Sequence, residues 1–148
     1  MNILAENKKA HFAYEILEAF QAGIALLGHE VKSIRQGQIT LLGAFVVLRG
    51  GEAFLVGSTI APYQPKNTPN DYDPTRARKL LLTKDEIDQL VGKTHQKGLT
   101  LVPLKVYSKN NRIKLEFGIA RGLKKANKKE LIRKKETKKE IERELKRI

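Results

Sequence analysis

Two neighbouring segments with the pattern of long β-strands constrain the fold more than any other feature of this sequence. Between residues 113 and 119, apolar residues alternate strictly with polar or small ones, which is typical of a strand with one buried face. Residues 99–107 are rich in Leu and Val, and Pro103 within them predicts an edge strand or a bulge because proline has no N–H for the ladder. Asn110 and Asn111 lie between the two segments and tolerate positive φ, so we predict a hairpin.

A second hairpin is predicted earlier in the chain. Residues 44–48 and 53–56 are strand-like, and the turn that joins them contains Gly50 and Gly51. A further, mostly apolar run occupies residues 12–20. We expect about five or six short strands in all, and therefore a mainly β fold with flanking helices, specifically an OB-like antiparallel barrel.

Two segments have the pattern of helices. Residues 83–86 form a T-x-x-E capping box, and an apolar stripe follows it until Gly98, a plausible end. Residues 28–35 form the second predicted helix, which Gly37 would end. Four prolines between residues 61 and 78 predict a long loop, and loops of that length in a compact domain are often functional.

Charge divides the chain into a body and a tail. The chain has 29 Lys and Arg against 16 Asp and Glu, a net charge of +13, and residues 121–148 carry 13 of these basic residues but only 5 of the acidic ones. Their large apolar residues are too few to build a core. We therefore predict an RNA-binding body at residues 1–120 and a basic tail at residues 121–148 that is mostly disordered alone and helical against an anionic surface. A solvated terminus that only aids solubility is the alternative.

Several classes of function find no support in the sequence. The lack of cysteine excludes a disulfide framework, a Cys-ligated zinc site and a thiol nucleophile. The three histidines form no metal-binding motif, and Asp71 and Asp73 lie beside Asn70 and Pro74, a context typical of turns. We expect no catalytic activity, no cofactor and no metal; a metal nuclease that uses Asp71 and Asp73 is the remote alternative.

The hydropathy pattern and the N-terminus bear on where the protein works. No apolar run approaches the roughly 18 residues that a membrane-spanning helix needs. The first residues also lack the pattern of a signal peptide. We therefore expect a cytoplasmic protein that does not contact a membrane.

The excess of positive charge indicates a polyanionic partner. Aromatic residues make up only 6% of the chain and Trp is absent, which gives little support for a platform that stacks single-stranded bases. A structured RNA that is recognised by its shape and backbone fits better. A body whose basic residues are merely solvated is the alternative. The basic candidates for phosphate contacts in the body are Lys8, Lys9, Lys32, Arg35, Arg76, Arg78, Lys79 and Lys114.

A series of short motifs extends along almost the whole chain. The most specific are E-V-K-S at residues 30–33 and R-K-L-L-L at residues 78–82. The others are N-K-K-A-H at 7–11, A-G-I at 22–24, the remainder of G-H-E-V-K-S-I-R-Q-G at 28–37, I-A-P-Y at 60–63, D-P at 73–74, R-A at 76–77, K-G-L-T-L-V-P-L at 97–104 and A-R-G at 120–122. In this order and spacing, the motifs resemble those of the SsrA-binding protein family (small protein B, SmpB), the partner of transfer-messenger RNA.

The resemblance implies a function in two parts. The body, an oligonucleotide-binding type of barrel, would bind the tRNA-like domain of transfer-messenger RNA. The tail would enter the vacant messenger channel near the decoding centre of a stalled ribosome and become helical there, so that the nascent peptide is tagged and the ribosome rescued. We expect a monomer when the protein is free.

The resemblance also implies roles for particular residues. It assigns RNA contacts in the body to Asn7, Leu81 and Lys114. The tail residues expected to contact the ribosome are Gly122, Lys124, Lys125, Lys128, Lys129, Lys134 and Lys135. The chain departs from the family pattern at Gln21, Leu123, Ala126 and Asn127, so no family role is carried over to these positions. A basic structural protein of the ribosome or a general RNA chaperone is the alternative function.

Overall fold

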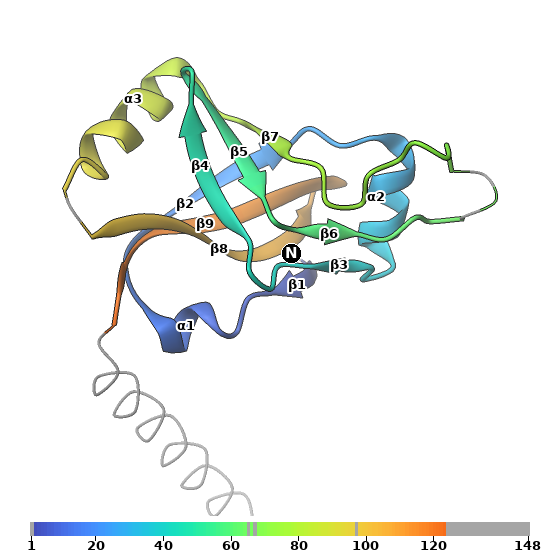
Figure 1. Cartoon of the computed structure of the whole chain (residues 1–148), viewed down its shortest axis with the longest axis horizontal. Helices are drawn as coiled ribbons and strands as arrows, with labels where there is room; N and C mark the ends of the chain where they lie inside the picture. The colour runs from blue at the N-terminus through green and yellow to red at the C-terminus, as the bar shows by residue number, and fades with distance from the viewer. Residues whose placement is uncertain (1, 65, 67, 97, 124–148) are drawn as a thin grey trace, which may run out of the picture.

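The computed structural model describes residues 2–64, 66, 68–96 and 98–123. Within these ranges the chain forms nine strands and three helices (Figure 1). The strands are β1 (Asn2–Glu6), β2 (Tyr14–Ile24), β3 (Ile39–Thr40), β4 (Phe45–Arg49), β5 (Glu52–Val56), β6 (Thr59–Ile60), β7 (Arg78–Leu81), β8 (Leu99–Lys109) and β9 (Arg112–Gly122), and the helices are α1 (Ala10–Ala13), α2 (Gly28–Arg35) and α3 (Lys84–Lys93). The prediction of a mainly β fold with few helices is confirmed, whereas the expected number of strands was too low.

Six of the strands close into a ring of antiparallel pairs. Their order is β8-β4-β5-β7-β2-β9, and β9 pairs with β8 again. β1 pairs with β8 outside this ring, while β3 and β6 form a separate two-stranded ribbon. Residues that point inward from different strands, among them Leu55, Leu80, Leu115 and Phe117, are almost fully buried and form the main core. Figure 1 shows α2 beside the β3–β6 ribbon, at the other end of the view from α1 and α3.

The long hairpin forms as the sequence predicts. β8 and β9 pair along their length, and the turn between them holds Asn110 and Asn111 at φ values of 53° and 62°. The strand β8 bulges between Pro103 and Lys105, which confirms the predicted irregularity, although β8 is not an edge strand. Its first part also pairs with β4 and its part beyond the bulge with β1, so the bulge lies where β8 changes neighbours.

The two predicted helices also form. Thr83 Oγ1 accepts a hydrogen bond from the Glu86 N–H (3.2 Å), and Glu86 Oε1 accepts one from the Thr83 N–H (3.0 Å), which is the predicted capping box of α3. This helix ends at Lys93, earlier than expected. The Thr94 N–H (2.9 Å) and hydroxyl (2.7 Å) both donate to the Leu90 carbonyl oxygen and cap the last turn. Gly98, at φ 89°, instead belongs to the turn before β8.

Gly118 of β9 lies against a bulge of β2 and leaves no room for a side chain. A Cβ at this position would lie 2.9 Å from Ile16 Cγ2 and 3.1 Å from the Glu18 carbonyl oxygen. We expect Gly118→Ala to lower the free energy of unfolding by about 1–3 kcal/mol through overpacking, as measured by urea unfolding. Gly122→Ala in the same strand is the control, since nothing lies within 4 Å of its Cβ. Equal unfolding midpoints for the two variants would contradict this account of the bulge.

The end of the described chain stays attached to the sheet. Gly122 pairs with Tyr14, and the Leu123 N–H donates to the Ala13 carbonyl (3.0 Å). The rest of the predicted tail, including its six lysine candidates, lies outside the described residues. None of the helices that the structure describes is both long and apolar enough to cross a membrane.

Candidate nucleic-acid interface

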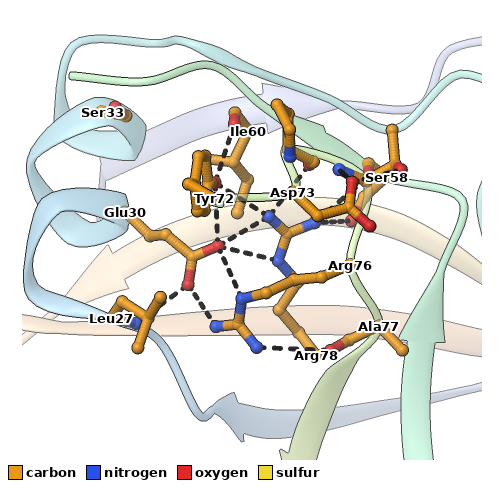
Figure 2. Close-up of polar contacts among 12 residues, drawn as sticks. Leu27, Glu30, Ser33, Ser58, Ile60, Tyr72, Asp73, Arg76, Ala77 and Arg78 are labelled. Atoms are coloured by element: carbon orange, nitrogen blue, oxygen red, sulfur yellow. Dashed lines mark hydrogen bonds and ion pairs between the residues drawn. The ribbon is translucent and has the colours of Figure 1, made fainter. Parts of the chain in front are cut away.

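A buried ion-pair cluster fixes α2 to the rest of the body (Figure 2). Its centre is Glu30, which is fully buried in the first turn of α2 and accepts a hydrogen bond from the Leu27 N–H (2.9 Å). Arg78, also fully buried, places its Nη2 at 2.6 Å and its Nε at 3.0 Å from Glu30 Oε2. Arg76 pairs with the other carboxylate oxygen, and the Tyr72 hydroxyl lies 3.0 Å from Oε2. One carboxylate therefore holds two guanidinium groups and a phenol.

The same cluster orders the long loop before β7. Arg78 donates to the carbonyl oxygens of Ser58 (3.2 Å) and Pro74 (3.0 Å), and the Tyr72 hydroxyl lies 2.9 Å from the Ile60 carbonyl oxygen. These contacts join α2, β6, β7 and the loop. The expectation that Arg78 contacts RNA from the surface is corrected here: its side chain is fully buried and all its donors face protein acceptors.

The cluster sets the ionisation of its members. Burial raises the pKa of Glu30, but hydrogen bonds from Arg76, the Leu27 N–H and Arg78 outweigh it, so the pKa falls from 4.5 to about 2. Burial, and then the hydrogen bond with Glu30, raises the pKa of Tyr72. At neutral pH Glu30 is therefore a carboxylate and Tyr72 keeps the proton that it donates.

A hollow of about 530 Å³ lies where α2 faces the ends of β2, β7 and β9. Three of the residues predicted to contact RNA meet here: Arg35 of α2, Leu81 of β7 and Lys114 of β9. The rest of its lining is largely apolar, with one more cation. The other lining residues are Gly23, Ile24, Leu26, Val31, Asn111, Arg112 and Ile113.

Strand pairing explains why Leu81 and Lys114 come together. Gly23 of β2 pairs with Leu81 on one side and with Lys114 on the other. A Cβ on Gly23 would lie only 3.3 Å from Leu81 Cδ1, so the absence of a side chain lets Leu81 lie close to the strand. The Leu81 residue is nevertheless 57% exposed. Leu81 and Lys114 therefore lie on the two strands that flank Gly23, which has no side chain to separate them.

Three cations surround this apolar surface. Arg35 Nη2 donates to the Asn111 carbonyl oxygen (3.0 Å), which ties the end of α2 to the β8–β9 turn. Arg112 shares the outer face of β9 with Lys114, because residues two apart in a strand point the same way. No carboxylate among the described residues forms an ion pair with any of the three. The sequence analysis did not predict Arg112 as an RNA contact. The same strand alternation that places Lys114 outward also places Arg112 outward, so it could have been identified.

Three of the remaining basic candidates lie outside this hollow and contact other side chains of the protein. Lys79 forms an exposed ion pair with Glu52 (3.0 Å). The Lys32 amino group lies 5.7 Å from the centre of the Tyr63 ring, a cation–π contact. The Arg76 side chain is 31% exposed, and its guanidinium pairs with Glu30 in the cluster described above.

The N-terminal candidates occupy a different region. Asn7, Lys8 and Lys9 line a second hollow, of about 260 Å³, together with residues of β1 and β3. The Asn7 side chain donates from Nδ2 to the Pro103 carbonyl oxygen (2.8 Å), and its N–H donates to the Leu104 carbonyl oxygen (2.8 Å). Asn7 therefore ties the chain after β1 to the bulge of β8. The structure thus groups six of the predicted contact residues into two hollows and leaves Lys32, Arg76, Arg78 and Lys79 outside both.

Asp73, one of the two aspartates considered for a metal site, accepts hydrogen bonds from within its own turn. Asp73 Oδ1 accepts hydrogen bonds from the Thr75 N–H (2.9 Å) and hydroxyl (2.8 Å), and these bonds lower the pKa of Asp73. In the part of the chain that the structure describes, no three His, Asp or Glu side chains gather as a metal site would require.

Comparison with known proteins supplies an independent assignment. The family model of the SmpB protein matches residues 4–147. The SsrA-binding protein of Thermosynechococcus vestitus is 49% identical over 146 residues, which cover 99% of this chain and 96% of the relative. That of Sulfurihydrogenibium sp. is 49% identical over 144 residues, covering 97% and 94%.

A solved structure supports the same family assignment. It is described as "tmRNA-SmpB: a journey to the center of the bacterial ribosome", and one of its chains matches this one with a TM-score of 0.69 and 46% identity. The match covers 90% of this chain and 96% of that one. The sequence-based identification is therefore confirmed, and the chain belongs to the SmpB family of SsrA-binding proteins.

Proposed function

We propose that this protein is an RNA-binding adaptor of trans-translation and not a catalyst. It binds the tRNA-like domain of transfer-messenger RNA and delivers it to stalled ribosomes, where the nascent peptide is tagged and the ribosome rescued. Its partners are this RNA and the ribosome, and it needs no cofactor. Membership of the SmpB family, and the similarity to a chain described together with tmRNA and the bacterial ribosome, support the proposal.

The two parts of the chain divide this work. The ring of six strands is an OB-like barrel that, with its helices, forms the RNA-binding body of residues 1–120. Residues 121–148 form the basic tail that passes into the vacant messenger channel near the decoding centre and becomes helical there. Their 13 basic and 5 acidic residues suit a channel lined by ribosomal RNA. The free protein is a cytoplasmic monomer.

The observation that carries the RNA-binding role is the hollow around Leu81. It combines an exposed apolar side chain with Arg35, Arg112 and Lys114, none of which has a carboxylate partner among the described residues. Unpaired cations at a concave surface attract phosphates strongly because no counter-charge of the protein must be displaced. Lys32, Lys79, Lys8 and Lys9 extend the positive surface around the body.

Binding should depend steeply on salt. If about six phosphates are contacted, the affinity for the tRNA-like domain should fall with a log–log slope of roughly −5, by analogy with duplex DNA. Lys114→Gln should weaken binding and reduce that slope by about 1. Fluorescence anisotropy with labelled tRNA-like domain at several KCl concentrations measures both quantities.

Lys84→Gln is the matched control for this experiment. Lys84 is an exposed lysine in the first turn of α3 and takes no part in the hollow. The log–log slope of RNA affinity against salt for the Lys84→Gln variant should equal that of the unaltered protein. A flat salt response of the unaltered protein, or the same slope for Lys114→Gln as for the control, would contradict the assignment of the hollow as the phosphate-binding site.

A further inference from the structure

We infer that the end of the tail, residues 140–148, docks as an amphipathic helix in a groove beside α1 when the protein is free. The proposed function uses the positive charge of the tail, but it gives no role to the apolar residues at the end of the tail or to those exposed in this groove. Docking involves this chain alone, so its test does not depend on the proposed function.

The groove consists of two adjoining hollows of about 260 Å³ each, of which one is the second hollow described above. The hollows are continuous because Asn7, Lys9 and Leu42 line both. Leu42, in the connection between β3 and β4, is 61% exposed, and Phe45, the first residue of β4, is 39% exposed. Phosphates alone would explain the lysine here, but not two large apolar side chains that face solvent at a concave surface. Such a surface is typical of an interaction site.

The end of the tail has the sequence pattern that an apolar groove accepts. Ile141, Leu145 and Ile148 are spaced i, i+4 and i+7, which places them on one face of a helix. Helices that bind in grooves use this spacing for the residues that anchor them. Ile132, nine positions before Ile141, would lie on the opposite face of a continuous helix. The apolar stripe therefore belongs to residues 140–148.

Charge favours this part of the tail over the part that precedes it. Residues 140–148 have three glutamates and three basic residues, whereas residues 124–139 have two glutamates and nine basic residues. The charged residues that line the groove are Glu6, Lys8 and Lys9, and neither lysine forms an ion pair with a carboxylate among the described residues. A segment without net charge meets less repulsion at these lysines than the basic segment does.

The tail starts at the groove itself. The Leu123 N–H donates to the Ala13 carbonyl oxygen (3.0 Å), and Ala13 lines the groove. Figure 1 shows the end of the described chain passing beside α1. The sixteen residues at 124–139 have a root-mean-square span of roughly 20 Å or more as a flexible chain, so residues 140–148 can return to a site this close. A short tether also keeps their effective concentration near the groove in the millimolar range, so that weak contacts suffice for docking.

The test uses the full-length protein, in which cysteine is absent, so that Lys146→Cys carries a single nitroxide label. We expect the label to broaden the amide NMR signals of Ala10, Leu42 and Phe45 far more than that of Gly50, which follows β4 at its other end. Comparing signals of residues that the same strand separates removes any general effect of the label on the body.

Variants of both surfaces identify the contact. Leu42→Gln, or Ile141→Gln combined with Leu145→Gln, should reduce the broadening severalfold, because each removes apolar contacts of the docked helix. Ile132→Gln is the matched control for the tail, since Ile132 lies off the stripe. Val91→Gln is the matched control for the body, since Val91 is an apolar residue of α3 that is 52% exposed. Both controls should leave the broadening unchanged.

A mixed sample distinguishes the protein's own tail from that of a second copy. Isotope-labelled protein without nitroxide is mixed with unlabelled protein that carries it, and we expect no broadening of the groove signals. Broadening in this sample equal to that in the singly labelled protein would show that the tail docks on another molecule and would overturn the inference. Broadening without preference for the groove, or equal broadening in Leu42→Gln and Val91→Gln, would overturn it as well and would leave the proposed function standing.

Discussion

Replacing Glu30 by glutamine should lower the free energy of unfolding by about 3–5 kcal/mol, the usual cost of removing one partner from a buried ion pair. The change leaves Arg78 fully buried beside a neutral amide, whereas Arg76, which is 31% exposed, can turn toward solvent. Desolvation of the unpaired Arg78 charge therefore dominates the cost. Urea unfolding followed by circular dichroism measures it.

Two further variants separate this effect from an ordinary loss of surface charge. Glu52→Gln removes an ion pair with Lys79 in which both side chains are about half exposed, so it should cost less than about 1 kcal/mol. Glu30→Gln combined with Arg78→Met removes the unpaired charge and should recover part of the stability that Glu30→Gln loses. A cost for Glu30→Gln as small as that for Glu52→Gln would show that the cluster does not hold the fold together.

The same carboxylate makes stability depend on acid pH. The pKa of Glu30 lies near 2 in the folded protein, below its ordinary value of 4.5, because of its hydrogen bonds to Arg76, Leu27 and Arg78. Its contribution is therefore complete above pH 4.5, and about 3 kcal/mol should be lost as the pH falls from 4.5 to 2. Urea midpoints measured over this range should fall more steeply for the unaltered protein than for Glu30→Gln. Parallel curves would exclude Glu30 as the source.

Ending the chain after Arg121 should abolish peptide tagging and leave the affinity for the tRNA-like domain nearly unchanged. All residues that line the hollow lie between Gly23 and Lys114, and the pairing of Glu15 with Arg121 keeps β9 joined to β2. The truncation removes the segment proposed to enter the messenger channel. Anisotropy measures the RNA affinity, and a reconstituted translation reaction on a messenger without a stop codon measures tagging.

A full-length variant distinguishes loss of charge from loss of length. Changing Lys124, Lys125, Lys128 and Lys129 to glutamine keeps the chain length but removes four positive charges from the first part of the tail sequence. Tagging by this variant should be strongly reduced, with RNA affinity again nearly unchanged. Loss of tagging and RNA affinity together in the truncated protein, or full tagging without the tail, would contradict separate roles for the two parts.

Much of the fold could be predicted because the relevant signals are local. The capping box at residues 83–86 and the two turns at Asn110-Asn111 and Gly50-Gly51 depend on neighbouring residues only. The missed strands include β3 and β6, which have two residues each, and β1, which lies outside the ring. The two-residue strands β3 and β6 form because of their partners and carry too few residues to show a period of their own.

The site could be predicted only in part, for a physical reason. Arg78 reads as a surface cation until the fold brings it to Glu30, 48 positions earlier, where the ion pair makes burial possible. Conversely, the row of Leu81, Gly23 and Lys114 exists only because β2 lies between β7 and β9. The order of strands in a ring depends on contacts between distant segments, which periodicity does not reveal.

The central claim, that this body recognises transfer-messenger RNA, is tested most directly by identifying the RNA that it retains in cells. The tagged full-length protein would be recovered at near-physiological salt and its RNA sequenced, beside a Leu81→Ala, Lys114→Gln variant that lacks two residues of the hollow. We expect one dominant tRNA-like species with the unaltered protein and a strong loss of that species with the variant. A broad mixture of RNAs, or ribosomal RNA in constant proportion from all translating ribosomes, would contradict the claim and favour a chaperone or a structural protein of the ribosome.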